Sequence, residues 1–300
     1  MRVAIEAGAP GAAPWISALR RQSRGEEIGE FRAGALAGIF GSAWLDFAIR
    51  GTDVFHACPR TPCAPRKTKL TATIDDLSFW LMPMLNTAGD IESAQEIADK
   101  LLAHAHGLIA VSESVRQDAI RVLGIEPENI ATIYPGVDAE FFEAKPERRE
   151  RPYVLAVGGD SARQNFQTVK DAWQALNPEL RDSFELVVNS TPAPELMAEA
   201  TLLVHIPLYE GFALPVAQAM AAGIAVVTSD SSSMPETGRD AAVMVDPHDA
   251  EQVATALTRL LESDSERAKL ARYGRARAEK YRWERCAAES LAFFHRVAGQ

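Results

Sequence analysis

The amino-acid sequence predicts an α/β protein with two parallel β-sheets in succession. Short apolar runs alternate along the chain with segments of helical period, which is the pattern of βα units and parallel sheets. This pattern starts again after a charged, proline-containing run at residues 144–152, AKPERRERP. The length of 300 residues fits two domains of ordinary size. We therefore expect two Rossmann-like domains facing across a cleft, with ligands beyond the carboxyl ends of the strands.

The first half of the chain contains five short apolar runs that predict strands. They are RVAIEA at 2–7, DVFHA at 53–57, KLTATI at 69–74, GLIAVS at 107–112 and NIATIY at 129–134. Residues 25–50 leave little room for more than one short strand and one helix. Between the last two runs, Ser114 and Gln117 form a capping-box pattern, which predicts a helix that runs to Gly124.

The second half contains five more runs of the same kind, separated by helical stretches. They are YVLAVG at 153–158, FELVVN at 184–189, TLLVHI at 201–206, IAVVTS at 224–229 and AVMVDP at 242–247. The final segment, 283–299, predicts an amphipathic helix. Its apolar face is formed by Ala287, Leu291, Phe294 and either Val297 or Ala298.

Composition and charge exclude several classes of function. A net charge of −10 and a pI near 5.2 argue against nucleic acid as the main partner. Three cysteines, Cys58, Cys63 and Cys286, are too few for a disulfide framework. No signal-peptide pattern and no apolar run long enough to span a bilayer is present in the sequence, so we expect a cytoplasmic protein.

The stretch LYEGFALPVAQAM places a loop between a predicted strand and a predicted helix. Pro215 suits the first turn of this helix, which we expect to end at Gly223. Backbone N–H groups at a helix N-terminus suit an anion such as a phosphate. Glu210 would face whatever the phosphate carries, and Gln218 lies one turn inside the helix.

The stretch GGDSARQNFQTV forms a second glycine-containing turn between a strand and a helix. Arg163 lies at this turn, where a cation can neutralise a diphosphate. A single Arg at a turn is most often a plain surface residue. An Arg and a Glu beside two helix N-termini of the same predicted sheet favour a binding site.

These stretches resemble the donor domain of the GT-B retaining glycosyltransferases of family 4, which transfer sugars from nucleotide-sugar donors. The resemblance also includes SSSMPETGRDAAVMVDPHD, TATIDDLSFWLMP and ADKLLAHAHGLIAVSESVRQDAIRVLGIEPENIATIYPGVD, and it covers most of residues 52–298. It implies a GT-B fold whose last helix crosses back onto the first domain. The implied parts are an acceptor-side domain at 1–148, a donor domain at 149–281 and the returning helix at 282–300.

The resemblance also implies roles for individual residues. Arg163 matches one of two cations that hold the diphosphate, and Gln164 replaces the other, a Lys. Glu210 would face the transferred sugar, and Gln218 replaces the glutamate that faces the ribose. With Asp75, the implied catalytic residues are Glu210 and Arg163. The implied donor-binding residues are Gly11, Arg163, Gln164, Glu210, Gly211, Phe212, Ala213, Leu214 and Gln218.

The sequence departs from the family pattern at several of these positions. Asp75 replaces the His of the family's TIHDL motif, while Asp76 matches. Ala213 replaces a Gly, and the first-domain loop from Gly8 to Gly11 matches loosely. The change from Glu to Gln at 218 should lose about 1–3 kcal/mol of charged hydrogen bonding. The loss of Lys at 164 matters more, because charge develops on the diphosphate in the transition state.

The resemblance implies transfer with retention of configuration from a UDP or GDP sugar. The acceptor would be a glycan, a lipid-linked sugar or a small molecule. The sequence lacks the DxD triplet of metal-dependent transferases, so we expect no metal and no cofactor, with Arg163 and helix dipoles acting on the phosphates. Two alternatives stay open: a relative that binds a sugar nucleotide or a partner without turnover, and a sugar-nucleotide epimerase of the same fold.

Three other features have an ordinary structural interpretation beside a functional one. His56, His104, His106 and His205 are expected to be structural. The apolar segment 78–85, SFWLMPML, fits core packing as well as an acceptor pocket. The first helix, with Arg20, Arg21 and Arg24, fits an ordinary surface helix or a weak contact with an anionic membrane.

Overall fold

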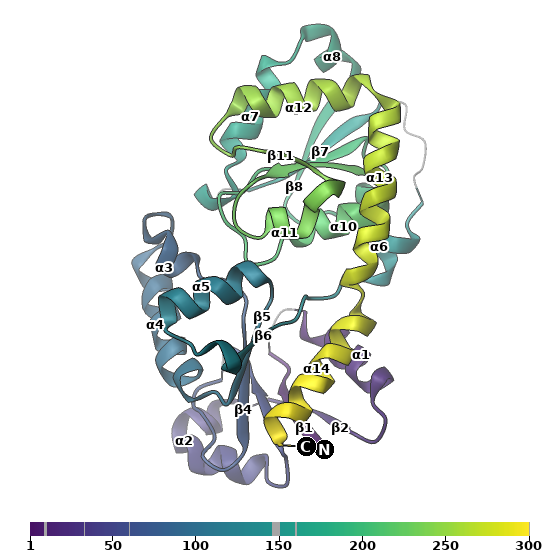
Figure 1. Cartoon of the computed structure of the whole chain (residues 1–300). Coiled ribbons are helices and arrows are strands. Elements are labelled where there is room, and N and C mark those ends of the chain that lie inside the picture. The colour runs from purple at the N-terminus through teal and green to yellow at the C-terminus, as the bar shows by residue number, and fades with distance from the viewer. Residues whose placement is uncertain (9–10, 33, 60, 146–150, 160, 300) are drawn as a thin grey trace. The chain divides into compact units, whose positions relative to one another are not determined.

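The computed structural model describes residues 1–8, 11–32, 34–59, 61–145, 151–159 and 161–299, which form two compact units. The first unit contains Met1–Gly136 and the segment from Trp283 onward, and the second contains Val137–Arg282. The domain boundary expected at 148/149 falls outside the described residues. Both units are α/β structures built on a parallel sheet, as Figure 1 shows, so the predicted fold class is confirmed.

The sheet of the first unit has six parallel strands in the order β2-β1-β3-β4-β5-β6. Five of them arise from the five predicted runs, and β2 forms in the short region after residue 25. The strands are β1 (Arg2–Glu6), β2 (Glu27–Phe31), β3 (Val54–Ala57), β4 (Lys69–Ile74), β5 (Gly107–Ala110) and β6 (Ile130–Thr132). Because β2 lies on one side of β1 and β3 on the other, the strand order reverses between β1 and β3.

Helices cover both faces of this sheet. The helices are α1 (Ala12–Gln22), α2 (Gly34–Ala48), α3 (Ser78–Leu81), α4 (Ala88–Lys100), α5 (Glu113–Leu123) and α14 (Trp283–Ala298). On one face, α1 and α14 pack together over β1 and β3, and Ile16, Leu19 and Phe294 are among the buried residues. On the other face, Leu45 of α2 and Ile49, directly after this helix, pack in a cluster with Phe55.

The start of α5 corrects one sequence prediction. Ser112, rather than Ser114, precedes the helix, and its hydroxyl accepts a hydrogen bond from the Val115 amide at 3.1 Å. Ser112 has an extended backbone, which a helix-capping residue needs, whereas Ser114 already lies within the helix. The helix ends before Gly124, whose φ of 66° is the left-handed conformation expected of a terminating glycine.

The sheet of the second unit has five parallel strands in the order β11-β10-β9-β7-β8. All five arise from the predicted runs. The strands are β7 (Tyr153–Val157), β8 (Glu185–Asn189), β9 (Leu202–His205), β10 (Ala225–Ser229) and β11 (Val243–Val245). The order reverses between β7 and β9, because β8 lies on one side of β7 and β9 on the other.

Eight helices flank the second sheet in the described part of this unit. They are α6 (Ala139–Glu143), α7 (Phe166–Ala175), α8 (Pro178–Ser183), α9 (Pro194–Ala198), α10 (Leu214–Ala222), α11 (Met234–Gly238), α12 (Ala250–Glu262) and α13 (Asp264–Ala278). A core under α7 and α12 includes Val154, Val204 and Leu257. Helices α10 and α13 pack against each other and against β10.

No helix in the described ranges of either unit has the length and apolar character needed to cross a bilayer.

Candidate functional site

The two loops predicted to carry chemistry meet at the switch point of the second sheet. One follows β7 and contains Arg163; the other follows β9 and contains Glu210. The Leu208 amide donates to the Arg163 carbonyl at 2.9 Å, and Arg163 Nη1 donates to the Tyr209 carbonyl at 3.3 Å. In parallel α/β sheets, ligands bind beyond the carboxyl ends of the strands at such a point. The structure therefore brings Arg163 and the Glu210 loop together where a ligand is expected.

The loop after β7 depends on a close approach of its backbone to the following helix. A side chain at Gly158 would place Cβ 2.8 Å from Cδ2 of Phe166, so a glycine is needed there. The chain then makes a 3₁₀ turn over Ala162–Gln164 and enters α7 after Asn165, which has a φ of 52°. The Gln164 side chain lies over Gly159. Residue 160, within the predicted motif, lies outside the described residues.

The backbone of Glu210 is fixed by two serines of the loop after β10. The Glu210 carbonyl accepts hydrogen bonds from Ser232 Oγ at 2.7 Å and from Ser233 Oγ at 2.8 Å. Ser232 adopts a φ of 52°, a left-handed conformation that costs energy for a non-glycine residue. These contacts hold Glu210 in place independently of a ligand, and they come from the SSSMPE stretch of the sequence motif.

The Glu210 carboxylate forms an ion pair with His205, which is fully buried at the end of β9. His205 Nε2 lies 3.0 Å from Glu210 Oε1, and Nδ1 lies 3.0 Å from the Val157 carbonyl oxygen. Both neighbours are acceptors, so both ring nitrogens must carry a proton for the two hydrogen bonds to form. Burial and the Arg163 charge lower the pKa of His205, but the Glu210 carboxylate and the Val157 carbonyl outweigh them, so the pKa is raised.

His205 is the site residue that sequence reasoning missed, because it was expected to be only structural. Its position five residues before Glu210, at the last residue of a buried strand, is the signal that could have identified it. Glu210 keeps only 17% of its side chain exposed. The contact with the buried imidazole restricts the orientation of this partly exposed carboxylate.

Helix α10 begins directly after the Glu210 loop, as the sequence predicts. Pro215 lies in its first turn, and the helix ends at Gly223 with a φ of 79°. Gly211, Phe212 and Ala213 are buried, and the Phe212 ring packs on Tyr281 with 5.3 Å between centroids. Contacts of these three residues with a donor would therefore come from their backbone. Among the predicted donor residues, Leu214 is exposed and Gln218 is half-buried on the helix.

Asp75 and Gly11, the other two predicted site residues, belong to the first unit. Asp75 follows β4 directly, and the next residue, Asp76, accepts a hydrogen bond from the Ser78 amide at 2.5 Å. Desolvation by the surrounding protein, and then the charge of Asp76, raise the pKa of Asp75, although its side chain still has exposed surface. Gly11 precedes α1 with a φ of 76°, which favours glycine. Residues 9 and 10 of this loop lie outside the described residues.

His56, the other buried histidine, makes contacts that fit the structural role expected for it. Its ring nitrogens lie 3.0 Å from Thr71 Oγ1 and 3.2 Å from Thr73 Oγ1. Burial lowers the pKa of His56 to about 3, so the ring stays neutral at physiological pH. In the apolar segment 78–85, Met84 is exposed and Phe79 and Trp80 are half-buried, so this segment does not form a fully buried core.

Two family models match consecutive parts of this chain. The family model for glycosyl transferases group 1 matches residues 141–277, and the model for glycosyltransferase family 4 matches residues 43–141. O-antigen chain mannosyltransferase B of Escherichia coli is 23% identical over 79% of this chain and 73% of its own length. MMP alpha-(1->4)-mannosyltransferase of Mycolicibacterium hassiacum is 27% identical over 73% of this chain, which spans 60% of that relative.

Solved structures show the same fold. HepE of Anabaena, crystallised with UDP-glucose, has a TM-score of 0.72 at 16% identity, with 98% of this chain and 100% of that chain covered. WaaG, a glycosyltransferase of lipopolysaccharide biosynthesis, also has a TM-score of 0.72, at 14% identity, with both chains covered fully. The GT-B architecture expected from the sequence is therefore confirmed.

Proposed function

We propose that this chain, as a member of the group-1 glycosyltransferases of family 4, transfers a sugar from a nucleoside-diphosphate sugar to a glycan acceptor. The observation that carries this proposal is the meeting of Arg163 with the Glu210–His205 pair at the switch point of the second sheet. The mannosyltransferase relatives and the UDP-glucose complex of HepE support a nucleotide-sugar donor of the UDP or GDP type. Three free cysteines, two of them buried, fit a reducing compartment such as the cytoplasm.

Arg163 stabilises the leaving diphosphate in this mechanism. Cleavage of the sugar–phosphate bond leaves additional negative charge on the diphosphate, and a preorganised cation lowers the energy of that transition state. The hydrogen bond from Arg163 to the Tyr209 carbonyl orients the guanidinium before the donor binds. The start of α10, after Ala213, adds a helix dipole whose positive end favours the phosphates. We infer that these groups act in place of a divalent metal.

Glu210 positions the sugar and stabilises positive charge at its anomeric carbon. His205 holds one carboxylate oxygen and the serines hold the backbone, so the position of Glu210 is fixed. A carboxylate held in this way suits hydrogen bonding to sugar hydroxyls better than nucleophilic attack. We therefore assign a retaining, front-face transfer, in which the acceptor oxygen bonds to the anomeric carbon as the diphosphate leaves from the same face. The leaving phosphate takes the acceptor proton.

The test is release of a nucleoside diphosphate by the purified protein. We expect one UDP- or GDP-sugar to give release that rises when a glycan acceptor is added. Arg163→Ala should lower the rate at least about a hundredfold, the size of effect found when one transition-state donor is removed. Arg259→Ala removes an exposed ion pair with Glu266 in the same unit and should leave the rate unchanged. Nucleotide binding without release across the panel would instead support a non-catalytic relative.

A further inference from the structure

Helix α2 of the first unit exposes a group of large apolar side chains. Ile39 is 71% exposed, Phe40 62% and Phe47 65%. Asp46 is the one charged residue in the sequence of this helix, 34–48. Single exposed apolar residues are normal, but a surface helix usually carries charged side chains on its solvent side. Gly41, with a φ of 65° and a ψ of −155°, interrupts α2, so Ile39 and Phe40 lie before the kink and Phe47 lies after it. Three exposed large apolar residues on these two adjoining helical segments indicate an interaction surface.

The fold itself does not need these three side chains. The inner side of α2 already supplies Leu45 to the buried cluster with Phe55 and Leu70, and Ile49, directly after the helix, belongs to the same cluster. Trp44 adds a ring contact with Phe31 at 6.3 Å between centroids. The helix is thus anchored by one set of residues, and Ile39, Phe40 and Phe47 remain outside the core.

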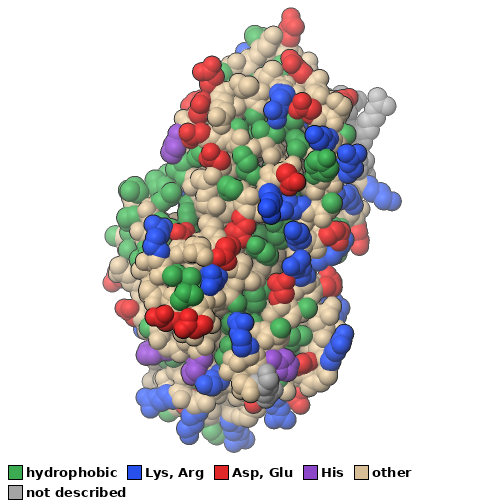
Figure 2. Space-filling model, viewed as in Figure 1, with side chains coloured by type: hydrophobic (Ala, Val, Ile, Leu, Met, Phe, Trp, Pro, Cys, Tyr) green, Lys and Arg blue, Asp and Glu red, His purple; other side chains and the backbone are tan. Residues whose placement is uncertain are grey.

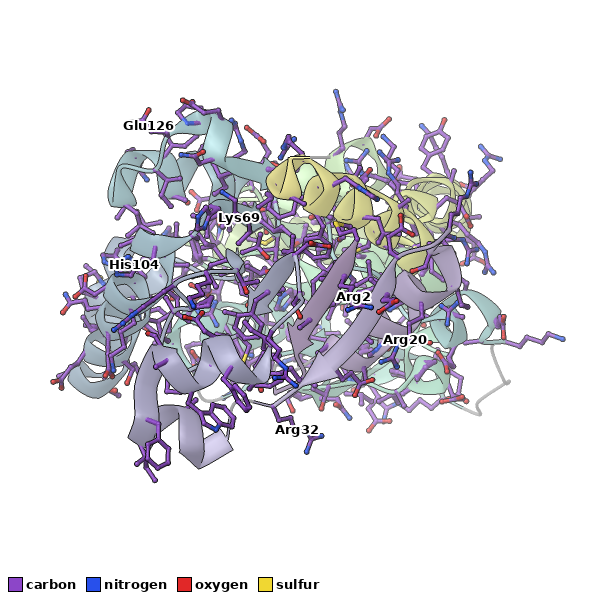
Figure 3. The ribbon with its side chains drawn as sticks, turned by 90° about the horizontal axis from the view of Figure 1, so that it is seen from below. Arg2, Arg20, Arg32, Lys69, His104 and Glu126 are labelled. Carbon is purple, nitrogen blue, oxygen red and sulfur yellow. The ribbon has the colours of Figure 1, made fainter. Side chains whose placement is uncertain are left out.

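The sequence around α2 is rich in positive charge, although the protein as a whole is acidic. Residues 32–69 contain six Lys or Arg residues and two Asp residues, whereas the whole chain has a net charge of −10. Figure 2 shows Lys and Arg side chains, with apolar side chains between them, at the end of the first unit where α2 lies in Figure 1. Figure 3 looks onto this end and shows side chains of α2 pointing outward, with Arg32 nearby.

Specific contacts hold several of these cations close to α2. The Arg50 guanidinium lies 5.1 Å from the centroid of the Phe47 ring. The Arg66 and Lys67 amides donate to Oδ1 of Asp46 at 2.9 and 3.2 Å, which places both residues beside the second half of the helix. Their side chains are exposed. Arg50, Arg66 and Lys67 therefore lie beside the half of α2 that carries Phe47, and together with the exposed apolar side chains of α2 we call them the α2 patch.

We propose that this patch, formed by Ile39, Phe40 and Phe47 with Arg50, Arg66 and Lys67, docks the protein onto a bilayer that contains anionic lipids. Apolar side chains can enter the interface between headgroups and acyl chains, while Lys and Arg bind anionic headgroups. A second copy of this chain fits less well, because a symmetric contact through the patch would bring like charges together. The inference goes beyond the proposed function, because it concerns where the protein is held rather than the reaction.

Helix α1, the other helix considered for membrane contact, does not present such a surface in its described residues. Its Ile16 and Leu19 are buried, and its Trp15 donates from Nε1 to Ser290 of α14 at 3.1 Å. Arg20 pairs with Glu30 at 2.9 Å. The apolar side of α1 is thus used inside the unit, which leaves α2 as the membrane-facing candidate.

Vesicle binding without any sugar nucleotide tests this proposal independently of turnover. We expect co-sedimentation with vesicles of three parts phosphatidylcholine and one part phosphatidylglycerol, and much weaker binding to phosphatidylcholine alone. The double variant Phe40→Ser/Phe47→Ser should lower the partition coefficient at least about tenfold, because two aromatic side chains no longer enter the interface. The double variant Arg66→Gln/Lys67→Gln should lower the partition coefficient about fivefold for each charge removed. This loss should occur with the anionic vesicles and not with phosphatidylcholine alone.

Tyr273 provides the matched control. It is an aromatic residue of α13 in the second unit, with 42% exposure, and Lys269 Nζ and Arg272 Cζ lie 5.8 and 5.6 Å from the centroid of its ring. Tyr273→Ser should leave vesicle binding unchanged, and circular dichroism should show that all variants are folded. Absence of binding by the wild-type protein would overturn the proposal. So would binding that the α2 variants leave intact, or a dimer in light scattering that Phe40→Ser/Phe47→Ser dissociates.

Discussion

At the scale of single residues, the Glu210–His205 pair is the feature with the clearest physical consequence. A buried imidazolium is stable only while its partners accept both protons, and here these are the Glu210 carboxylate and the Val157 carbonyl. The pair also lies near the charge of Arg163, which opposes protonation of His205. The orientation of the proposed sugar-facing carboxylate therefore depends on the protonation of a residue that itself cannot reach the ligand.

We predict that His205→Gln lowers kcat about tenfold or more while the Kd for the nucleoside diphosphate changes less than about threefold. Glutamine fills part of the space but cannot supply the charge that fixes Glu210. Initial rates and isothermal titration calorimetry would measure the two quantities. Equal losses in both would show that His205 supports the whole loop rather than Glu210 alone.

The stability difference between the wild-type protein and His205→Gln should depend on pH. Because the folded-state pKa of His205 is raised, its stabilising contribution is complete below the unfolded pKa of about 6.5 and is lost as pH rises through the folded value. The melting temperature of the wild-type protein should therefore fall toward that of His205→Gln as pH increases from 6 to 9, that is, over roughly the range in which histidine titrates. A difference that stays constant with pH would contradict the charged state of His205.

Gln218 allows a gain-of-affinity prediction. If this residue faces the ribose, Gln218→Glu restores a charged acceptor for its hydroxyls, worth about 1–3 kcal/mol. The Kd for the donor should then fall about tenfold or more, and Gln167→Glu on the exposed side of α7 serves as the control for added negative charge. An unchanged Kd for Gln218→Glu would remove Gln218 from the donor site.

At the scale of elements, strands were more predictable than helix ends. Strands β7 and β9 are buried along their whole length, so their nearly continuous apolar runs, YVLAVG and TLLVHI, could be recognised directly. Strand β2, EIGEF, is largely exposed and has no such run. The start of α5 was misplaced because Ser112 and Ser114 both fit a capping position locally, and only the backbone conformation distinguishes them. The His205–Glu210 contact could not be predicted either, since it depends on how the loop after β9 folds back over the strand.

The contact between α10 and α13 gives a prediction at this scale. A Cβ atom at Gly274 would lie 3.0 Å from Met220 Cγ and 3.4 Å from the Met220 Cα, which is too tight for a larger side chain. Gly274→Val should therefore lower the free energy of unfolding by about 1–3 kcal/mol. Gly38→Ala, in a helix where a Cβ meets nothing within 4 Å, should instead be neutral or stabilising by up to about 1 kcal/mol. Urea unfolding measures both, and equal effects would refute the packing argument.

At the scale of the whole molecule, the protein consists of two units with separate cores. The clusters under α1 and α2 belong to the first unit, and the cluster under α7 and α12 belongs to the second. The chain passes between the units after Gly136 and again after Arg282. The residues proposed to hold the diphosphate, Arg163 and the Glu210 loop, all lie in the second unit. Nucleotide binding should therefore stabilise the second unit more than the first.

This arrangement predicts a selective effect of the free nucleoside diphosphate, which lacks the sugar. A ligand at about 100 times its Kd stabilises the state that binds it by about 2.7 kcal/mol. For a unit of this size, that corresponds to a rise of about 5–10 °C in melting temperature. Calorimetry should show the shift in the transition of the second unit, and hydrogen exchange should show protection in the loops after β7 and β9. Arg163→Ala should reduce the shift. Equal stabilisation of peptides from β1 and β4 of the first unit would show instead that the nucleotide site depends on both units.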